Sequence, residues 1–311
     1  RIATRVNQEY PGTRSLFTST ARKAKKLKAP FKKSIIKTNK KWANIEVWRA
    51  MKLTSQDLTP SFYATALDGR YTVDKGFVEQ NENRQIYVKL FWRTFVISAS
   101  VMGLCLFLGY PVAYLLATLP LRTSNLLMIM VLLPFWTSLL VRTTAWIAIL
   151  QSQGVINDLM VAVGITADDS RFSLIYNMTG TIIAMTHILL PFMILPLYSV
   201  MKTIPPSYMR AARSLGATPT MAFIKVYVPQ TIPGVGAGGL LVFILAIGYY
   251  ITPALVGGQD GQLISNMIAY HMQKSLNWSL AAALGGILLA GVLLLYWIYD
   301  RVIGIDNMKL G

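Results

Sequence analysis

Few residues in the apolar stretches of this sequence are of types that do chemistry. Arg142 is the only formal charge inside a membrane-length apolar run, and His187 and the single cysteine, Cys105, lie in two others. The sequence contains no HExxH helix, no nucleophile elbow and no Cys/His cluster with metal-ligand spacing. The glycine-rich segment 257–261 lacks the Lys-Ser/Thr end of a phosphate-binding loop. We therefore expect no enzyme activity in this chain, and no cofactor or metal.

Arg142 has two possible roles. An ionisable side chain within a membrane usually faces a cavity or a partner, which makes Arg142 a candidate for a translocation path or gate. A long arginine can also extend to the membrane interface, and both alternatives stay open. His187 has no second ligand near it in the sequence, so we interpret it as a hydrogen-bonded structural histidine. Cys105 is interpreted as a buried, inert thiol.

Aromatic residues are the other candidates for a translocation path. Trp136 and Trp146 either pack at the membrane interface or contact a transported solute. Tyr249 and Tyr250 lie between a glycine and a proline, where a membrane helix could open, so we predict that they line the path.

The elements that must position these residues are membrane helices. The chain is 54% hydrophobic and 14% charged, whereas a soluble domain carries about 25% charged residues. Five stretches are long and apolar enough to span a bilayer: Phe95–Thr118, Leu126–Leu150, Met178–Met201, Val235–Val256 and Ser279–Tyr299. The sequence predicts an all-α integral membrane protein, with a transmembrane domain over 93–311.

The front end, residues 1–92, has a different composition. Arg1–Arg93 holds 20 of the 30 Lys and Arg but only 7 of the 13 Asp and Glu. Apolar residues between Pro30 and Met51 follow helical spacing among lysines, which predicts one or two basic amphipathic helices. The simplest interpretation is a solvated helical face packed on the membrane domain. We expect no nucleic-acid binding, because the chain is fixed in a membrane and shows no base-stacking motif.

The loop 202–233, between two predicted spans, predicts two short helices. Pro205-Pro206 suits a helix start, and Gly216 ends that helix. Pro219 opens a second helix, which we expect Pro229 to stop. Two short helices between membrane spans suggest a docking element.

This loop resembles the EAA loop of binding-protein-dependent ABC importer permeases. Ala211-Ala212, Gly216 and the segment Val226–Pro229 fall at the spacing of that motif, whereas its acidic position is Arg210 here. The resemblance implies that Arg210, Ala211, Ala212, Gly216, Val226 and Pro229 couple the chain to an ATPase. An arginine at this position cannot make an ion pair that the family's glutamate makes with a cation.

Segments 133–143 and 153–157 are similar to those of the spermidine/putrescine permeases of the same class. The resemblance implies a MetI-like bundle in the bacterial inner membrane, with five spans visible here and a sixth expected upstream. It also implies a second permease subunit, a periplasmic binding protein and an ATPase dimer that holds the ATP and Mg²⁺. Residues 1–92 look like an enlarged first extracytoplasmic loop in this family.

The sequence leaves alternatives open for the membrane topology and for the transported solute. The cationic loop 202–233 fits a cytoplasmic position, and counting spans from it places residues 1–92 outside, against their own charge. We follow the short loops, because the charge rule is weak for segments longer than about 60 residues. Polyamines are the first choice of cargo, and an opine or other amino-acid-like solute is the second. A secondary transporter is a further alternative, although the spans lack a carboxylate for ion coupling.

Overall fold

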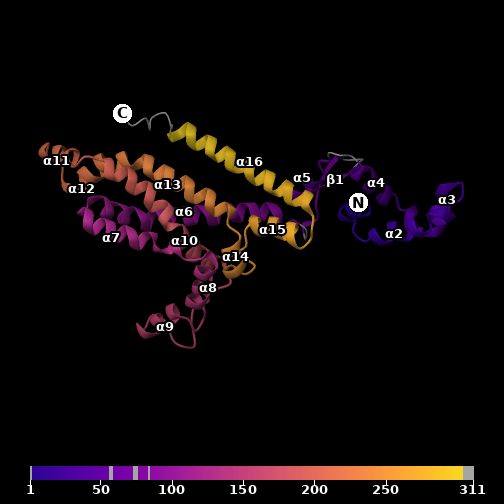
Figure 1. Ribbon diagram of the computed structural model, residues 1–311, viewed down its shortest axis with the longest axis horizontal. Coiled ribbons are helices and arrows are strands. Elements are labelled where there is room, and N and C mark those ends of the chain that lie inside the picture. The colour runs from indigo at the N-terminus through magenta and orange to yellow at the C-terminus, as the bar shows by residue number, and fades with distance from the viewer. Residues whose placement is uncertain (1, 56–58, 73–75, 83–84, 304–311) are drawn as a thin grey trace. The chain divides into compact units, whose positions relative to one another are not determined.

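The structure is a computed structural model that describes residues 2–55, 59–72, 76–82 and 85–303. Helices make up nearly all of its secondary structure (Figure 1). Within the described residues, the strands are β1 (Gly69–Thr72) and β2 (Gly76–Glu79), an antiparallel hairpin. Contacts divide the chain into two compact units. The first unit comprises Arg1–Lys89 and Tyr270–Leu284, and the second comprises Leu90–Ala269 and Gly285–Gly311.

The first unit contains short helices that pack around aromatic residues. They are α1 (Ile2–Glu9), α2 (Arg14–Arg22), η1 (Ala24–Lys26), α3 (Phe31–Thr38), η2 (Lys40–Ala43), α4 (Ile45–Thr54) and α5 (Ser61–Ala66). Trp42 is buried, and its Nε1–H donates to Thr20 Oγ1 over 2.8 Å. The predicted helical spacing is confirmed here, but Phe31 and Ile45 are more than half exposed, so the apolar face is only partly covered.

A buried polar network lies at the start of α6 (Tyr87–Thr118). The Asp68 carboxylate accepts hydrogen bonds from three successive N–H groups of residues 86–88, over 2.7–2.9 Å, so it caps the helix. The Tyr87 hydroxyl lies 2.9 Å from His271 Nε2, and His271 Nδ1 lies 2.9 Å from Ser275 Oγ. Burial lowers the pKa of His271 below its usual 6.5.

The second unit contains long apolar helices and the shorter helices between them, and α6 belongs to it from Leu90 onward. Its other helices are α7 (Leu121–Leu132), η4 (Leu133–Trp136), α8 (Leu139–Leu150), α9 (Val155–Ala162), α10 (Met178–Thr203), α11 (Pro206–Ser214), α12 (Pro219–Ala222), η5 (Phe223–Tyr227), α13 (Val228–Gly248) and α14 (Ile251–Val256). Helices α15 (Ile264–Gln273) and α16 (Trp278–Ile303) also have residues in both units. Helices α10 and α13 pack closely because α13 carries glycines at the contact. A Cβ on Gly238 would lie 2.9 Å from Met193 Sδ, so a larger residue there would force the helices apart.

Five described segments are long and apolar enough to cross a membrane, which confirms the predicted number: Tyr87–Thr118, Leu139–Ala162, Met178–Thr203, Pro219–Gly248 and Trp278–Arg301. Segment Leu139–Ala162 contains α8 and α9, joined across the turn at 151–154.

The prediction of one continuous span over Leu126–Leu150 is wrong. The helix breaks after Leu132, and Thr137 and Ser138 are extended, with ψ of 144° and 143°. Pro134 within this segment cannot donate an amide hydrogen bond, and its ring clashes with a helical carbonyl. The resulting 12-residue helices are each about 18 Å long, shorter than a bilayer core of about 30 Å.

Candidate functional site

The helix–turn–helix at 206–222 contains a specific helix-ending motif. At the end of α11, the Gly216 N–H donates to Arg213 O over 3.0 Å and the Ala217 N–H donates to Ala212 O over 3.1 Å. These two bonds form a Schellman cap, which requires a left-handed residue at the position of Gly216. Its φ is +92°, and a Cβ there would meet nothing within 4 Å. The spacing from Ala212 to Gly216 is therefore set by helix termination, and the constraint on Gly216 is its backbone conformation.

The second helix begins as predicted but does not end at Pro229. Thr218 Oγ1 accepts a hydrogen bond from the Met221 N–H over 3.3 Å, and Pro219 occupies the first turn of α12. A π-helical segment, η5, follows, and the chain continues through Pro229 into α13. The prediction that Pro229 stops the helix is wrong. The wider π-helical turn directly before it changes the hydrogen-bond register, so the missing N–H of the proline is tolerated.

Aromatic side chains fix this element on the membrane helices. Tyr114 of α6 makes edge contacts with Phe223 and Tyr227 of η5, with ring centroids 5.3 Å apart in each case. Phe223 and Tyr227 stack on each other at 5.5 Å. The Lys202 Nζ donates to Ala117 O over 3.3 Å at the end of α6. A movement of the helix–turn–helix would therefore be transmitted to α6 and α13.

The helix–turn–helix exposes a mixed apolar and cationic surface. Leu215 and Tyr208 are 89% and 50% exposed, and Arg210 and Arg213 are exposed beside them. We call these four residues the coupling surface. No ion pair to Arg210 or Arg213 forms among the described residues. The exposed apolar and cationic side chains make the coupling surface a candidate for contact with another protein.

The predicted coupling residues divide by burial. Arg210, Ala211, Gly216 and Pro229 are exposed, whereas Ala212 and Val226 are half-buried supports of the element. Sequence reasoning missed Tyr208 and Leu215. The available signal was a large apolar residue next to the glycine that ends the helix.

A second candidate site surrounds the break between α13 and α14 (Figure 1). The chain leaves the helix at Tyr249 (ψ 129°), as the neighbouring glycine and proline predicted. The freed carbonyls have dedicated partners. Ser265 Oγ donates to Tyr249 O over 2.6 Å, and Asn266 Nδ2 donates to Tyr250 O over 2.8 Å. Both donors come from the start of α15 and were missed in the sequence. The break in the helix is thus stabilised, because side chains of α15 form hydrogen bonds with the backbone carbonyls that the break leaves without helical partners.

Helix α8 brings polar residues to this break. The Thr143 and Thr252 hydroxyls lie 3.2 Å apart and join α8 to α14. The Trp146 Nε1–H donates to His187 Nδ1 over 3.1 Å, which confirms the hydrogen-bonded histidine. Arg142 lies on the same helix, directly before Thr143 and one helical turn before Trp146. We call Arg142, Trp146, His187 and Tyr249 the Arg142 cluster.

The remaining contacts define what this cluster can do. Arg142 Nε is buried and has no hydrogen-bond partner among the described residues. Tyr250 is 40% exposed, whereas Trp136 is 89% exposed and makes no hydrogen bond to any residue that the structure describes. Across the same described ranges, no group of three His, Cys, Asp or Glu side chains could hold a metal ion. The Arg142 cluster therefore retains one buried donor, Arg142 Nε, that a polar group from outside the chain would satisfy.

The chain has similar proteins of known kind. Residues 106–303 match the family described as "Binding-protein-dependent transport system inner membrane component". The spermidine/putrescine transport system permease protein PotB of Escherichia coli K12 is 35% identical over 202 residues, covering 64% of this chain and 73% of that protein. The PotB protein of Haemophilus influenzae is 33% identical over 225 residues, covering 72% and 78%.

A solved structure has the same fold. The bacterial alginate ABC transporter in complex with an alginate pentasaccharide-bound periplasmic protein contains a chain that aligns with a TM-score of 0.60. The alignment covers 94% of this chain and 99% of that one, at 16% identity. The membrane-length helices and the matched sequence agree on a multi-pass protein of the inner membrane. The chain belongs to the family of binding-protein-dependent transport system inner membrane components, and it is a transport permease.

Proposed function

We propose that this permease docks a separate ATPase through the coupling surface. The observation that carries the proposal is the capped helix–turn–helix, which exposes Tyr208 and Leu215 and continues into η5, itself packed on α6 through aromatic contacts. In this proposal an ATPase dimer binds ATP and Mg²⁺ on the cytoplasmic side, and its movement reaches the membrane helices through η5. The coupling residues are Arg210, Ala211, Ala212, Gly216, Val226 and Pro229, together with Tyr208 and Leu215.

The proposed transport path runs by the opening at Tyr249 and Tyr250. Transport proteins place solute-binding sites at breaks in membrane helices, and the break at Tyr249 and Tyr250 is of this kind. Helix α8 is joined to α14 by the Thr143 and Thr252 hydroxyls, and its residues Arg142 and Trp146 form the wall of the opening in the proposal. A second permease subunit completes the path, and a periplasmic binding protein delivers the cargo. Residues 1–92 are then extracytoplasmic, as the span count requires.

A polyamine is the proposed cargo. The support is the similarity to permease proteins whose names specify spermidine and putrescine. Selectivity for a polycation then comes mainly from the binding protein, because the four residues of the Arg142 cluster include aromatic rings but no carboxylate. A secondary transporter, the alternative from the sequence, has no support in this family.

One observation favours a second cargo class. Arg142 Nε is buried and unpaired, and a carboxylate is the partner that satisfies a guanidinium best. A small solute with a carboxylate, such as an opine or another amino-acid-like compound, would supply that partner.

Reconstitution tests these proposals. The permease, its cognate partner permease and ATPase are placed in liposomes, and uptake of labelled spermidine is measured with ATP inside and loaded binding protein outside. We expect uptake that requires both ATP and the ATPase. Transport of an amino-acid-like solute but not spermidine would replace the cargo, and uptake without the ATPase would refute the proposed energy source.

A further inference from the structure

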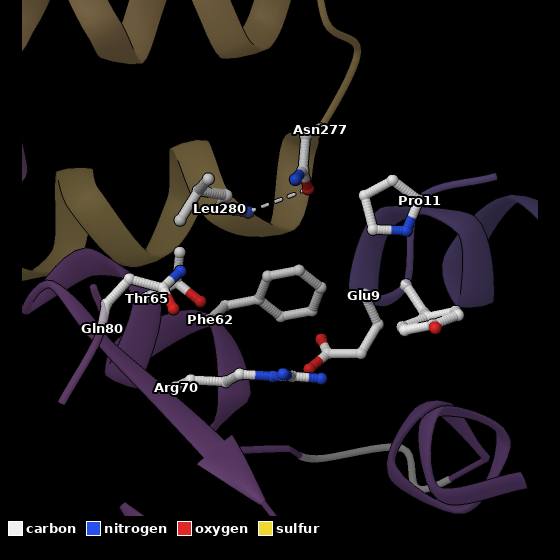
Figure 2. A pocket seen from close by; sticks show the side chains of 9 residues that line it. Glu9, Pro11, Phe62, Thr65, Arg70, Gln80, Asn277 and Leu280 are labelled. Carbon is white, nitrogen blue, oxygen red and sulfur yellow. Dashed lines mark hydrogen bonds between the residues drawn. The ribbon is translucent and has the colours of Figure 1, made fainter. Parts of the chain in front are cut away.

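The first unit contains a cavity that the proposed transport function does not use. Its volume is about 440 Å³, within the range of small-molecule sites. Its lining includes charged, polar and aromatic side chains, among them those of Glu9, Tyr10, Phe62, Arg70, Gln80 and Asn277. All belong to the first unit, whereas the Arg142 cluster belongs to the second. Figure 2 shows Glu9 and Arg70 extending from opposite sides into the same space, with the Phe62 ring beside them.

Glu9 supplies a fixed negative charge. Its Oε2 accepts a hydrogen bond from Ser61 Oγ over 2.8 Å, which holds the carboxylate at the end of α1. No ion pair to Glu9 forms within the described residues, and Oε1 has no donor there. Tyr10, the next residue in the chain, also lines the cavity, and an aromatic ring attracts a cation. This wall fits an ammonium group.

Arg70 supplies the opposite charge on the other wall. Its Nη2 lies 3.7 Å from Glu46 Oε2, beyond hydrogen-bond distance, while Glu46 Oε1 accepts from Arg49 Nη1 over 2.6 Å. The charge of Glu46 is thus shared between two arginines, and the planar donors of Arg70 stay available. A guanidinium binds a carboxylate through two parallel hydrogen bonds. This wall fits a carboxylate.

We propose that the cavity binds a small zwitterion, an α-amino acid or a similar compound. Its ammonium group lies against Glu9, its carboxylate against Arg70, and its side chain against Phe62. A simple amine would leave Arg70 unmatched and a simple carboxylate would leave Glu9 unmatched, so both charges are needed for binding. Asn277 caps the first turn of α16, its Oδ1 accepting the Leu280 N–H over 3.3 Å. Ligand in the cavity therefore stabilises the segment 277–280 together with α1 and β1.

Three ligands of one length test the proposal on the full chain in lipid nanodiscs. L-Norleucine carries both charges, n-pentylamine carries only the ammonium, and hexanoate carries only the carboxylate. Binding is measured by saturation-transfer NMR and by the rise in melting temperature. We expect binding of L-norleucine alone. Glu9→Gln and Arg70→Gln should each weaken it about tenfold to hundredfold, because each removes one charged hydrogen-bonding partner.

Matched variants separate this site from general charge effects. Glu79→Gln and Arg22→Gln change exposed charges of the same unit that do not line the cavity, and should bind L-norleucine like the unmodified chain. Arg70→Lys keeps the charge and should recover part of the affinity, and the melting temperature without ligand shows whether each variant is folded. Equal binding of n-pentylamine, unchanged affinity in Arg70→Gln, or no binding of any of the three ligands would each overturn the proposal. Uptake of the cargo by the reconstituted importer is a separate readout, so failure here leaves the proposed transport function intact.

Discussion

Leu215 gives the sharpest test of the coupling surface. It is 89% exposed, so Leu215→Ala removes almost no packing from the chain itself. Exposed substitutions of this kind change the free energy of unfolding by about 0.5 kcal/mol or less. Any large effect of the substitution must therefore come from a surface that covers Leu215 in the assembled importer.

The expected effect on docking follows from area burial. Complete burial of a leucine side chain stabilises a complex by about 1.5–3 kcal/mol. The loss of that contribution weakens association of permease and ATPase about tenfold to hundredfold. Loop ordering adds little here, because the Schellman cap at Gly216 already fixes the turn before docking.

Association is measured with purified permease in nanodiscs and the ATPase labelled with a fluorophore, and ATP hydrolysis is measured in parallel. Ile165→Ala is the matched control, since Ile165 is 65% exposed on the loop 151–177 and lies outside the coupling surface. We expect Leu215→Ala to weaken association and Ile165→Ala to leave it unchanged. Equal affinity in both variants would refute the assignment of the coupling surface.

Four further perturbations test other parts of the protein. Gly216→Val should strain the turn by about 1–3 kcal/mol at φ +92° and reduce uptake, whereas Gly164→Val, at φ +78° on the other loop, should leave uptake unchanged although its local strain is similar. Arg142→Met should lower uptake about tenfold or more without lowering the amount of inserted protein, with Arg122→Met as the exposed control; normal uptake in Arg142→Met would favour an arginine that only extends to the interface. A cysteine at Thr18 should react with an impermeant thiol reagent outside spheroplasts and one at Ser214 should not, against a low background from the buried Cys105; the opposite pattern would invert the topology. Burial lowers the pKa of His271, so the unfolded chain binds a proton at this residue more readily than the folded chain. The folded protein is therefore not destabilised by His271 above about pH 6.5, and it loses stability as the pH falls from there toward the folded-state pKa. His271→Gln should remove this part of the fall in melting temperature between about pH 7 and 5, and an unchanged fall would assign it to other groups.

Elements whose signals are local could be predicted from the amino-acid sequence. Runs of about 20 uncharged apolar residues predict membrane helices, because a helix of that length and composition matches the hydrocarbon core of a bilayer. Gly216 and Pro219 predict a helix end and a helix start, since each depends on the backbone of one or two residues. The opening at Tyr249 was predicted in the same way from its neighbouring glycine and proline.

Features that depend on a partner far away in the chain could not be predicted from the sequence. The carbonyls at Tyr249 and Tyr250 are satisfied by Ser265 and Asn266, and no local rule pairs these residues. The helix continues through Pro229 because a π-helical turn, packed on Tyr114 of α6, precedes it. The cavity between Glu9 and Arg70 joins residues far apart in the chain. Hydrogen bonds and packing act over a few ångströms of space, so chain folding alone determines which residues they join.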